Sequence, residues 1–173
     1  MTFLSIYTPT FRRPFLLELC KASVAAQSAP VEHVVVEDKV GVGVYRMIRD
    51  HVGEVHGEYV MVLSDDNVLV DGEFAADLAT EAFEADLPDV VMFKGQIAST
   101  LQPAAWACEP IATMVDLSCF AVRRDVWLAH AADWGDRYLG DFDFIHSLWT
   151  AGCRFYWWDR LVFRALQVTG PPA

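Results

Sequence analysis

Residues 57–67 read Gly-Glu-Tyr-Val-Met-Val-Leu-Ser-Asp-Asp-Asn, an apolar run that ends abruptly in polar side chains. The unbroken apolar run at residues 59–63 is typical of a strand buried on both faces of a parallel sheet. Ligands of open α/β sheets bind where the strands end, so the four polar residues stand where a site is expected. This stretch therefore predicts an α/β fold and the edge of the sheet that carries the chemistry.

Towards the N-terminus, two further strand patterns alternate with two helical ones. Short apolar runs rich in β-branched residues occupy residues 3–8 and 31–36. Apolar residues recur at helical spacing over residues 14–26 and 45–55, and Pro14 suits the first turn of the earlier helix. A strand–helix–strand–helix–strand order predicts a parallel sheet covered by helices.

Beyond residue 67 the alternation continues without an internal repeat. We expect a helix at residues 73–83, a strand at 90–94, a loop at 101–110, a strand-like segment at 116–123, a helix at 141–151 and a late strand at 155–158. Gly152 suits the position after the end of the last helix. The pattern predicts one Rossmann-like α/β domain over residues 1–173, with a mostly parallel central sheet flanked by helices.

The composition is that of a folded domain. The chain has 173 residues and a mass of 19.4 kDa, and its hydrophobic fraction of 54% excludes a disordered protein. Its net charge is −11, which disfavours duplex DNA as a partner because phosphate binding needs a basic surface.

Nothing in the sequence predicts a membrane span or a secretory signal, because the apolar runs are too short. The four cysteines, Cys20, Cys108, Cys119 and Cys153, have no metal-binding spacing. We therefore expect a reduced, cytoplasmic protein. The sequence leaves the oligomeric state open.

Two acidic pairs follow strands of the predicted sheet. Asp65 and Asp66 offer hard oxygen ligands to Mg²⁺ or Mn²⁺, or else belong to an Asp-rich turn that caps the next helix. Glu37 and Asp38 either accept hydrogen bonds from a base or ribose or form a solvated turn. For Asp65 and Asp66, the local sequence does not decide between a metal site and a capping turn. For Glu37 and Asp38, it favours the solvated turn.

Two more segments carry candidate chemistry. Arg12 and Arg13 follow the first strand, where guanidinium groups suit a diphosphate, although a capped loop with solvated charges explains them equally. Asp141 and Asp143 open the last helix, where they complement its dipole, and one of them is a candidate general base.

Taken together, these segments resemble the family 2 glycosyltransferases of the GT-A fold over about residues 3–159. The family's turn of the type PTYNR resembles TPTFRR at residues 8–13. Its acidic pair after the second strand resembles Glu37-Asp38, and its GEYIxFLDxDD motif resembles residues 57–66. Its later acidic helix start resembles residues 140–152.

The resemblance implies an inverting, metal-dependent transfer of a sugar from a nucleotide-diphosphate donor, first of all a UDP-sugar, to an acceptor hydroxyl of a carbohydrate or another molecule. It implies a metal ion, Mn²⁺ or Mg²⁺, on Asp66 and a catalytic base at Asp141. It implies a donor pocket that contains Thr8, Pro9, Arg12, Asp38 and Asp65. Residues 1–70 would form the nucleotide-sugar-binding half, and residues 88–173 the acceptor-side half.

The sequence also departs from the family pattern. Ser64 stands where the first carboxylate of the D-x-D motif is expected, and no histidine follows Trp158. These departures favour an alternative, a catalytically inactive nucleotide-sugar-binding module of the same fold. Trp134, in the segment before Asp141, is a candidate platform for an acceptor sugar, and core packing is its alternative role.

Overall fold

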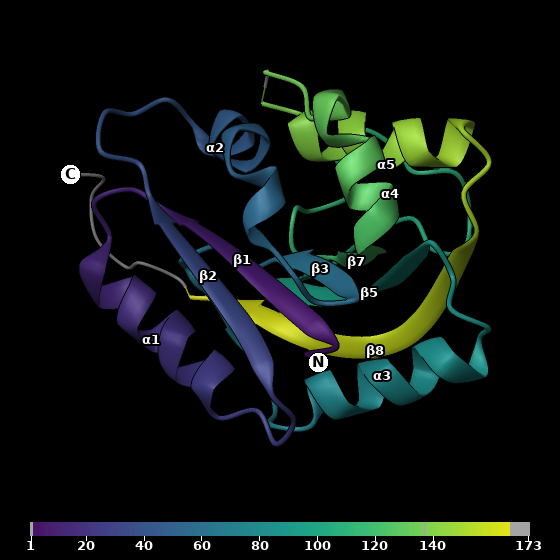
Figure 1. Cartoon of the computed structure of the whole chain (residues 1–173), viewed down its shortest axis with the longest axis horizontal. Coiled ribbons are helices and arrows are strands. Elements are labelled where there is room, and N and C mark those ends of the chain that lie inside the picture. Colours follow the sequence, from purple (N-terminus) through teal and green to yellow (C-terminus); the bar gives the residue numbers. More distant parts are fainter. Residues whose placement is uncertain (1, 137, 167–173) are drawn as a thin grey trace.

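A computed structural model describes residues 2–136 and 138–166. Figure 1 shows a sheet between two groups of helices, with α1 and α3 on one side and α2, α4 and α5 on the other. In chain order the elements are β1 (Leu4–Thr10), α1 (Pro14–Ala25), β2 (Val31–Glu37), α2 (Val44–Asp50), η1 (Val52–Glu54), β3 (Tyr59–Val62), β4 (Asn67–Leu69), α3 (Phe74–Glu84), β5 (Val90–Ile97), β6 (Thr100–Gln102), β7 (Phe120–Arg123), α4 (Arg124–Ala129), η2 (Ala131–Asp133), α5 (Gly140–Thr150) and β8 (Phe155–Ala165).

The sheet has the strand order β2-β1-β3-β7-β5-β8-β4, and β6 pairs with β5 outside this path. Strand β1 is parallel to β2 and β3, whereas β7 is antiparallel to both β3 and β5, and β8 is parallel to β5. Strands β1, β2, β3, β5 and β8 therefore point the same way. The predicted α/β fold with a mostly parallel sheet flanked by helices is confirmed.

The apolar runs of the sequence form the centre of this sheet. Every residue of β1 and β3 is buried, as expected for strands with helices on both faces. The edge strand β2 is only partly buried. Helix α1 begins at Pro14 as predicted, and Gly152 follows α5 with a φ of 79°, a left-handed conformation that favours glycine.

Several stretches differ from the sequence-based expectation. The helix expected over residues 45–55 ends at Asp50, and residues 101–102, expected in a loop, belong to β6. Three further differences concern strands. The late strand continues to Ala165, because β8 shifts its register against β5 where the charged residues Asp159 and Arg160 occur. Asn67, expected in a polar turn, begins the short strand β4 and pairs with Ala165. Residues 116–119, expected in a strand, instead form a turn before β7, in which the Cys119 N–H donates to the carbonyl of Asp116 (3.0 Å).

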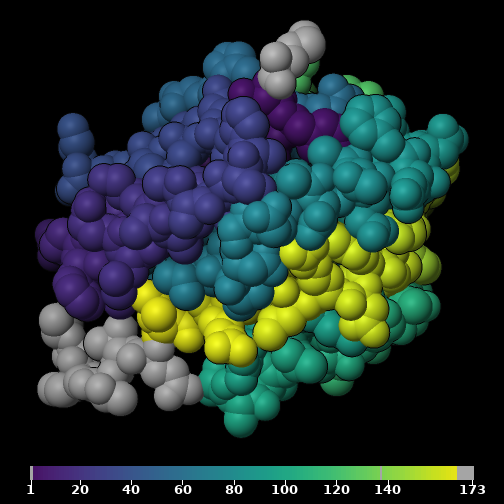
Figure 2. Space-filling model, turned by 90° about the horizontal axis from the view of Figure 1, so that it is seen from below, coloured from purple at the N-terminus to yellow at the C-terminus, as the bar shows by residue number. Residues whose placement is uncertain are grey.

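Strand β8 also shapes the outer surface. Figure 2 shows it as a yellow band at the surface beside the teal residues of α3. Arg160 of β8 forms ion pairs with Asp77 in α3 and with Asp71 (2.9 Å) in the segment before that helix. Within residues 2–136 and 138–166, no helix is both long and apolar enough to cross a membrane.

Candidate active site

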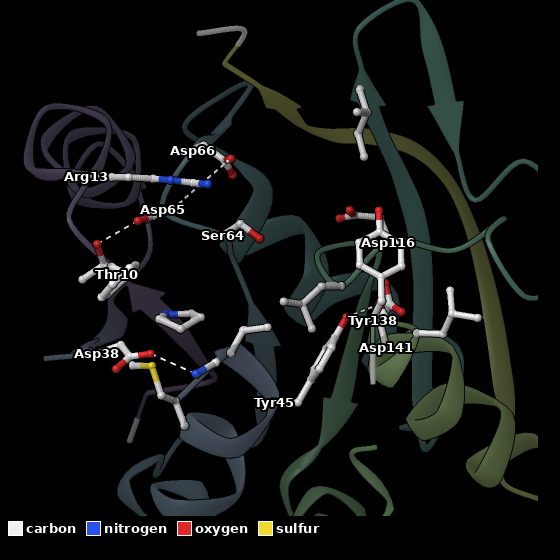
Figure 3. Close-up of a pocket in the computed structure, with 18 of the residues that line it drawn as sticks. Thr10, Arg13, Asp38, Tyr45, Ser64, Asp65, Asp66, Asp116, Tyr138 and Asp141 are labelled. Carbon is white, nitrogen blue, oxygen red and sulfur yellow. Dashed lines mark hydrogen bonds and ion pairs between the residues drawn. The ribbon is translucent and has the colours of Figure 1, made fainter. Parts of the chain in front are cut away.

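A pocket of about 630 Å³ opens at the edge of the sheet where the parallel strands end. It collects residues that lie far apart in the sequence, from the ends of β1 and β3, the loop after β2, the turn before β7 and the start of α5. Figure 3 shows two walls facing each other. The β1–β3 wall carries Thr10, Arg13, Asp38, Asp65 and Asp66, and the α5 wall carries Tyr45, Asp116, Tyr138 and Asp141.

The carboxylates after β3 are bound by donors from β1 and the turn that follows it. The buried carboxylate of Asp65 accepts hydrogen bonds from the Thr10 hydroxyl (2.7 Å) and the Arg13 guanidinium (3.2 Å). The same nitrogen of Arg13 donates to Asp66 at 2.8 Å, and the Asp66 side chain is 34% exposed. One arginine thus neutralises both carboxylates, and Asp66 is the more accessible of the two.

Asp38 organises the loop between β2 and α2. Its carboxylate accepts hydrogen bonds from the N–H groups of Val40 (3.1 Å), Gly41 (2.6 Å) and Gly43 (2.9 Å). The hydrogen bond from Gly43 is the main reason why the pKa of Asp38 lies below its usual value. Gly41 and Gly43 have φ of 81° and 93°, so glycine is needed for the loop to wrap around the carboxylate.

Residues 8–13, at the end of β1 and in the turn after it, only partly face the pocket. Pro9 lines it, but Thr8 does not, because its buried hydroxyl contacts His33 (2.9 Å) and the thiol of Cys20 in α1. Arg12 does not line it either. It has a φ of 55° and places its guanidinium over the ring of Phe11, 4.8 Å from the centroid. The arginine that faces the pocket is Arg13.

Asp141 lies on the opposite wall, in the first turn of α5. Its Oδ1 accepts the N–H of Phe142 at 2.8 Å, and the side chain lines the pocket. Burial raises the pKa of Asp141 above its usual value, and Asp143 adds to this effect. A carboxylate with a raised pKa is a stronger base than an ordinary one, which suits the removal of a proton from a hydroxyl.

Asp116 is a pocket residue that the sequence analysis missed. It lies in the turn before β7, where its Oδ1 accepts the N–H of Ser118 (2.9 Å). The Ser118 hydroxyl accepts hydrogen bonds from the Ser64 N–H (3.2 Å) and the side chain of Asn67 (3.0 Å), which ties this turn to the end of β3. Burial, followed by the charges of Asp141 and Asp66, raises the pKa of Asp116 to about 6.

Trp134 does not form a platform for an acceptor sugar. It is only 1% exposed, and its ring stacks on Phe144 with a centroid distance of 4.1 Å and an angle of 7°. It also contacts Trp127 and Tyr45. The proposed acceptor role of Trp134 is therefore wrong, and core packing, the alternative that the sequence left open, accounts for it.

Asp65 and Asp66 suit a metal ion that is shared with a bound phosphate better than one held by protein ligands alone. Among the described residues, no group of three or more His, Cys, Asp or Glu side chains is arranged to hold a metal ion. Mg²⁺ and similar ions are often held by one or two carboxylates together with substrate phosphates. The accessible carboxylate of Asp66, beside Asp65, fits an ion shared with a diphosphate and does not fit an ion held by protein ligands alone.

Comparisons with known proteins agree with this architecture. The sequence matches no protein-family model and no curated protein. The structure resembles residues 1–349 of TarS from S. aureus, a glycosyltransferase, with a TM-score of 0.71 and 15% identity. This match covers 95% of the present chain and 60% of that one.

Two further structures show the same likeness. TarS 1–349 in complex with UDP-GlcNAc has a TM-score of 0.67 and 14% identity, over 98% of this chain and 60% of that one. A197 from STIV has a TM-score of 0.55 and 17% identity, over 91% of this chain and 82% of that one. The chain thus spans about 60% of the length of the TarS 1–349 structures. It has a GT-A-like, Rossmann-type fold, as the sequence predicts.

Proposed function

We propose that the protein is a glycosyltransferase that moves a sugar from a nucleotide-diphosphate donor to an acceptor hydroxyl with inversion. One observation carries this proposal: a single pocket, at the edge of the sheet where the parallel strands end, is lined by Asp38, Asp66 and Asp141. These residues belong to three separate segments of the chain. A ligand that fills this pocket would meet the loop held by Asp38 on one side and Asp141 on the other.

The β1–β3 wall would hold the donor. The loop that Asp38 organises would surround the nucleotide base, and Arg13 would contact the diphosphate, because a guanidinium binds phosphate oxygens bidentately. Asp66, with Asp65 beside it, would hold Mn²⁺ or Mg²⁺. Such an ion would supply positive charge that stabilises the leaving diphosphate. This wall belongs to residues 1–70, the half that we assign to nucleotide-sugar binding.

The α5 wall would carry out the proton transfer. Asp141 would take the proton of the acceptor hydroxyl as its oxygen bonds to the anomeric carbon. The bond between that carbon and the diphosphate oxygen breaks, and its electron pair leaves with the diphosphate. A positioned base typically contributes about 10²–10⁴-fold. Residues 88–173, which include Asp141 and Asp116, would form the acceptor side.

The identity of the ligands is narrowed by two observations. TarS is known in complexes with UDP and UDP-GlcNAc, so these are the first compounds to test here. The net charge of −11 favours a carbohydrate or another small hydroxyl compound over duplex DNA as acceptor.

The proposal is tested by nucleotide binding. Thermal unfolding is followed with UDP, GDP, TDP, ADP and CDP, with and without Mn²⁺, for the wild type, Asp66→Ala and Asp159→Ala. Asp159 is the matched control, since it too is a carboxylate paired with a cation, Lys94, but it lies outside the pocket. A ligand at a hundredfold excess over Kd adds about 2.7 kcal/mol of stability. We expect one nucleotide to stabilise the wild type and Asp159→Ala only when Mn²⁺ is present, and Asp66→Ala to lose this effect. No stabilisation by any nucleotide contradicts the proposal.

The second candidate function is a nucleotide-sugar-binding module without catalysis. It is favoured by the ion pair between Arg13 and Asp66, which occupies the accessible carboxylate, and by Ser64 in place of an acidic residue. Release of UDP from UDP-GlcNAc separates the two candidates. Turnover that disappears in Asp141→Asn supports the enzyme, whereas nucleotide binding without turnover for any donor or acceptor supports the module.

A further inference from the structure

Tyr138 is the most exposed of the large hydrophobic side chains that the structure describes around the pocket. It is 92% exposed, yet it lines the pocket three residues before Asp141. Figure 3 shows its ring on the α5 wall, together with Asp116 and Asp141. The face of this aromatic ring is therefore open to a ligand that enters the pocket.

The backbone that carries the ring is held in place. The carbonyl of Tyr138 accepts a hydrogen bond from the hydroxyl of Tyr45 (3.2 Å), and the carbonyl of Leu139 accepts one from the N–H of Asp143 in α5 (2.9 Å). Four residues before Tyr138, Trp134 is buried in the core. The exposed ring thus extends into the pocket from a backbone that is fixed on its α5 side and anchored near its start.

Tyr45, which binds the Tyr138 carbonyl, is itself fixed by packing. Its ring stacks on the buried Trp134, with a centroid distance of 5.9 Å and an angle of 18°. It also lies against Gly140, the first residue of α5, where an added Cβ would come within 2.6 Å of the ring. The position of the Tyr138 backbone is therefore set by α2, through Tyr45, as well as by α5.

The same wall supplies hydrogen-bond acceptors beside the ring. One carboxylate oxygen of Asp116, Oδ1, accepts the N–H of Ser118 at 2.9 Å. Within residues 2–136 and 138–166, no hydrogen-bond donor reaches the other oxygen of Asp116, so this oxygen can accept a hydroxyl of a ligand. Asp141, the proposed base, lines the pocket as well.

An aromatic face next to two carboxylates suits one class of acceptor. A pyranose sugar has C–H groups on the faces of its ring, which pack against an aromatic face, and hydroxyl groups around its edge, which donate to carboxylates. A linear polyol has the hydroxyl groups without a broad apolar face. Ligand pockets commonly combine such an aromatic surface with a few placed polar groups.

We propose that Tyr138 is the acceptor-binding residue: its ring stacks on the face of a pyranose sugar whose hydroxyl groups contact Asp141 and Asp116. This inference rests on the proposed function, because it names the acceptor class of the same site. Tyr138 takes the role that the sequence suggested for Trp134, which is buried and out of reach of a ligand.

The experiment compares Tyr138→Ala and Tyr138→Phe with Phe83→Ala. Phe83 is the matched control, since its ring is also exposed (63%) but belongs to α3, on the other side of the sheet and outside the pocket. The probes are the methyl pyranosides of glucose, galactose, mannose and N-acetylglucosamine, together with the linear polyol sorbitol. Saturation-transfer NMR measures the contact of each probe with the full chain in the presence of UDP and Mn²⁺. Release of UDP from UDP-GlcNAc is followed in parallel at increasing probe concentration.

We expect at least one methyl pyranoside, and not sorbitol, to receive saturation at its ring C–H groups. In Tyr138→Ala this signal weakens, and the KM for that sugar rises about 3- to 10-fold, as expected for the loss of one aromatic contact. Tyr138→Phe keeps the ring and behaves like the wild type, as does Phe83→Ala. The Kd of UDP is unchanged in all three variants, because the β1–β3 wall is not altered.

Three results overturn the inference: no signal from any pyranoside, a sorbitol signal equal to that of the pyranosides, or a sugar signal and KM in Tyr138→Ala that equal those of the wild type. Failure of the proposed function is a different result, in which UDP neither binds nor is released in any of the proteins. Saturation transfer to the sugars without nucleotide then still decides whether Tyr138 binds them.

Discussion

The two walls of the pocket treat their carboxylates in opposite ways. On the β1–β3 wall, Asp65 and Asp66 share the guanidinium of Arg13, and Asp38 is bound by three backbone N–H groups. On the α5 wall, neither Asp116 nor Asp141 has an ion-pair partner among the described residues, and burial raises the pKa of both. The first wall stabilises negative charge, and the second resists it.

This difference matches two separate chemical tasks. A wall that already offers an arginine, aligned N–H groups and an accessible carboxylate suits an anion and its metal ion. A wall of desolvated carboxylates suits the uptake of a proton near neutral pH. Changing one carboxylate or its partner at a time tests whether the two walls have separate tasks.

Asp141→Asn should abolish the function of the α5 wall alone. An amide cannot take up a proton, so we expect release of UDP from UDP-GlcNAc to fall about 10²–10⁴-fold. Stabilisation by UDP and Mn²⁺ should stay at the wild-type level, because the amide leaves the opposite wall unchanged. Normal turnover in this variant would exclude Asp141 as the base and remove the contrast between the walls.

Asp38→Ala should damage the β1–β3 wall instead. It removes the acceptor of three N–H groups, so the loop at residues 39–43 loses the contacts that shape it. We expect the Kd of the nucleotide that stabilises the wild type in the thermal-unfolding test to rise at least about tenfold, as measured by calorimetric titration. Glu37→Ala, the neighbouring acidic residue that does not line the pocket, is the control. An unchanged Kd in Asp38→Ala would separate this loop from donor binding.

Asp116→Asn should stabilise the protein at neutral pH. Folding raises the pKa of Asp116 from 3.8 to about 6, so the folded state holds this proton more tightly than the unfolded state. Stability is therefore lost as the pH rises through this window, and an asparagine that keeps the hydrogen bond to Ser118 avoids the loss.

Urea denaturation checks this prediction. We expect the free energy of unfolding of Asp116→Asn to exceed that of the wild type by about 1–2 kcal/mol at pH 7, with the difference shrinking towards pH 4. A variant that is less stable than the wild type at pH 7 would show that the carboxylate of Asp116 is compensated after all.

Arg13→Gln should have the smallest effect on stability. The Arg13 side chain is 52% exposed, and such ion pairs contribute less than about 1 kcal/mol. The change frees Asp66, so we expect Mn²⁺ alone to raise the melting temperature more in Arg13→Gln than in the wild type. Arg13→Lys, which keeps the charge, should behave like the wild type. An equal response to Mn²⁺ in all three proteins would mean that Arg13 does not compete for a metal ion at Asp66.

The positions of most of these carboxylates can be predicted from the sequence, for a physical reason. Unbroken apolar runs reveal buried strands, and the polar residues that end them must lie at one edge of the sheet. This reasoning puts Asp38, Asp65 and Asp66 at the pocket, where they lie, and the family resemblance adds Asp141, which also lines it. Their chemical roles stay predictions until they are tested.

The residues that the sequence analysis missed or misplaced have equally physical explanations. Asp116 precedes β7, and because β7 runs against its neighbours, the start of this strand meets the ends of the others. Arg12 and Arg13 are adjacent, and only the backbone conformation decides which of them turns inward. Tyr45 reads as one residue of an amphipathic helix. Trp134 is buried by side chains of other elements, such as Phe144 in α5. Its own segment therefore gives no sign of its burial.

The pairing of β4 with β8 has a consequence for the order in which the molecule assembles. Asn67 is paired with Ala165, and the N–H of Leu166 donates to the carbonyl of Asp66 at 2.7 Å. Contacts between residues so far apart in the chain form slowly, because a long loop must close first. Strands β1, β2 and β3 can pair while the ribosome is still synthesising the rest. Asp66 lies four residues after the end of β3, yet its backbone carbonyl gains its partner only after β8 has emerged. The segment that holds the candidate metal ligand is therefore completed late.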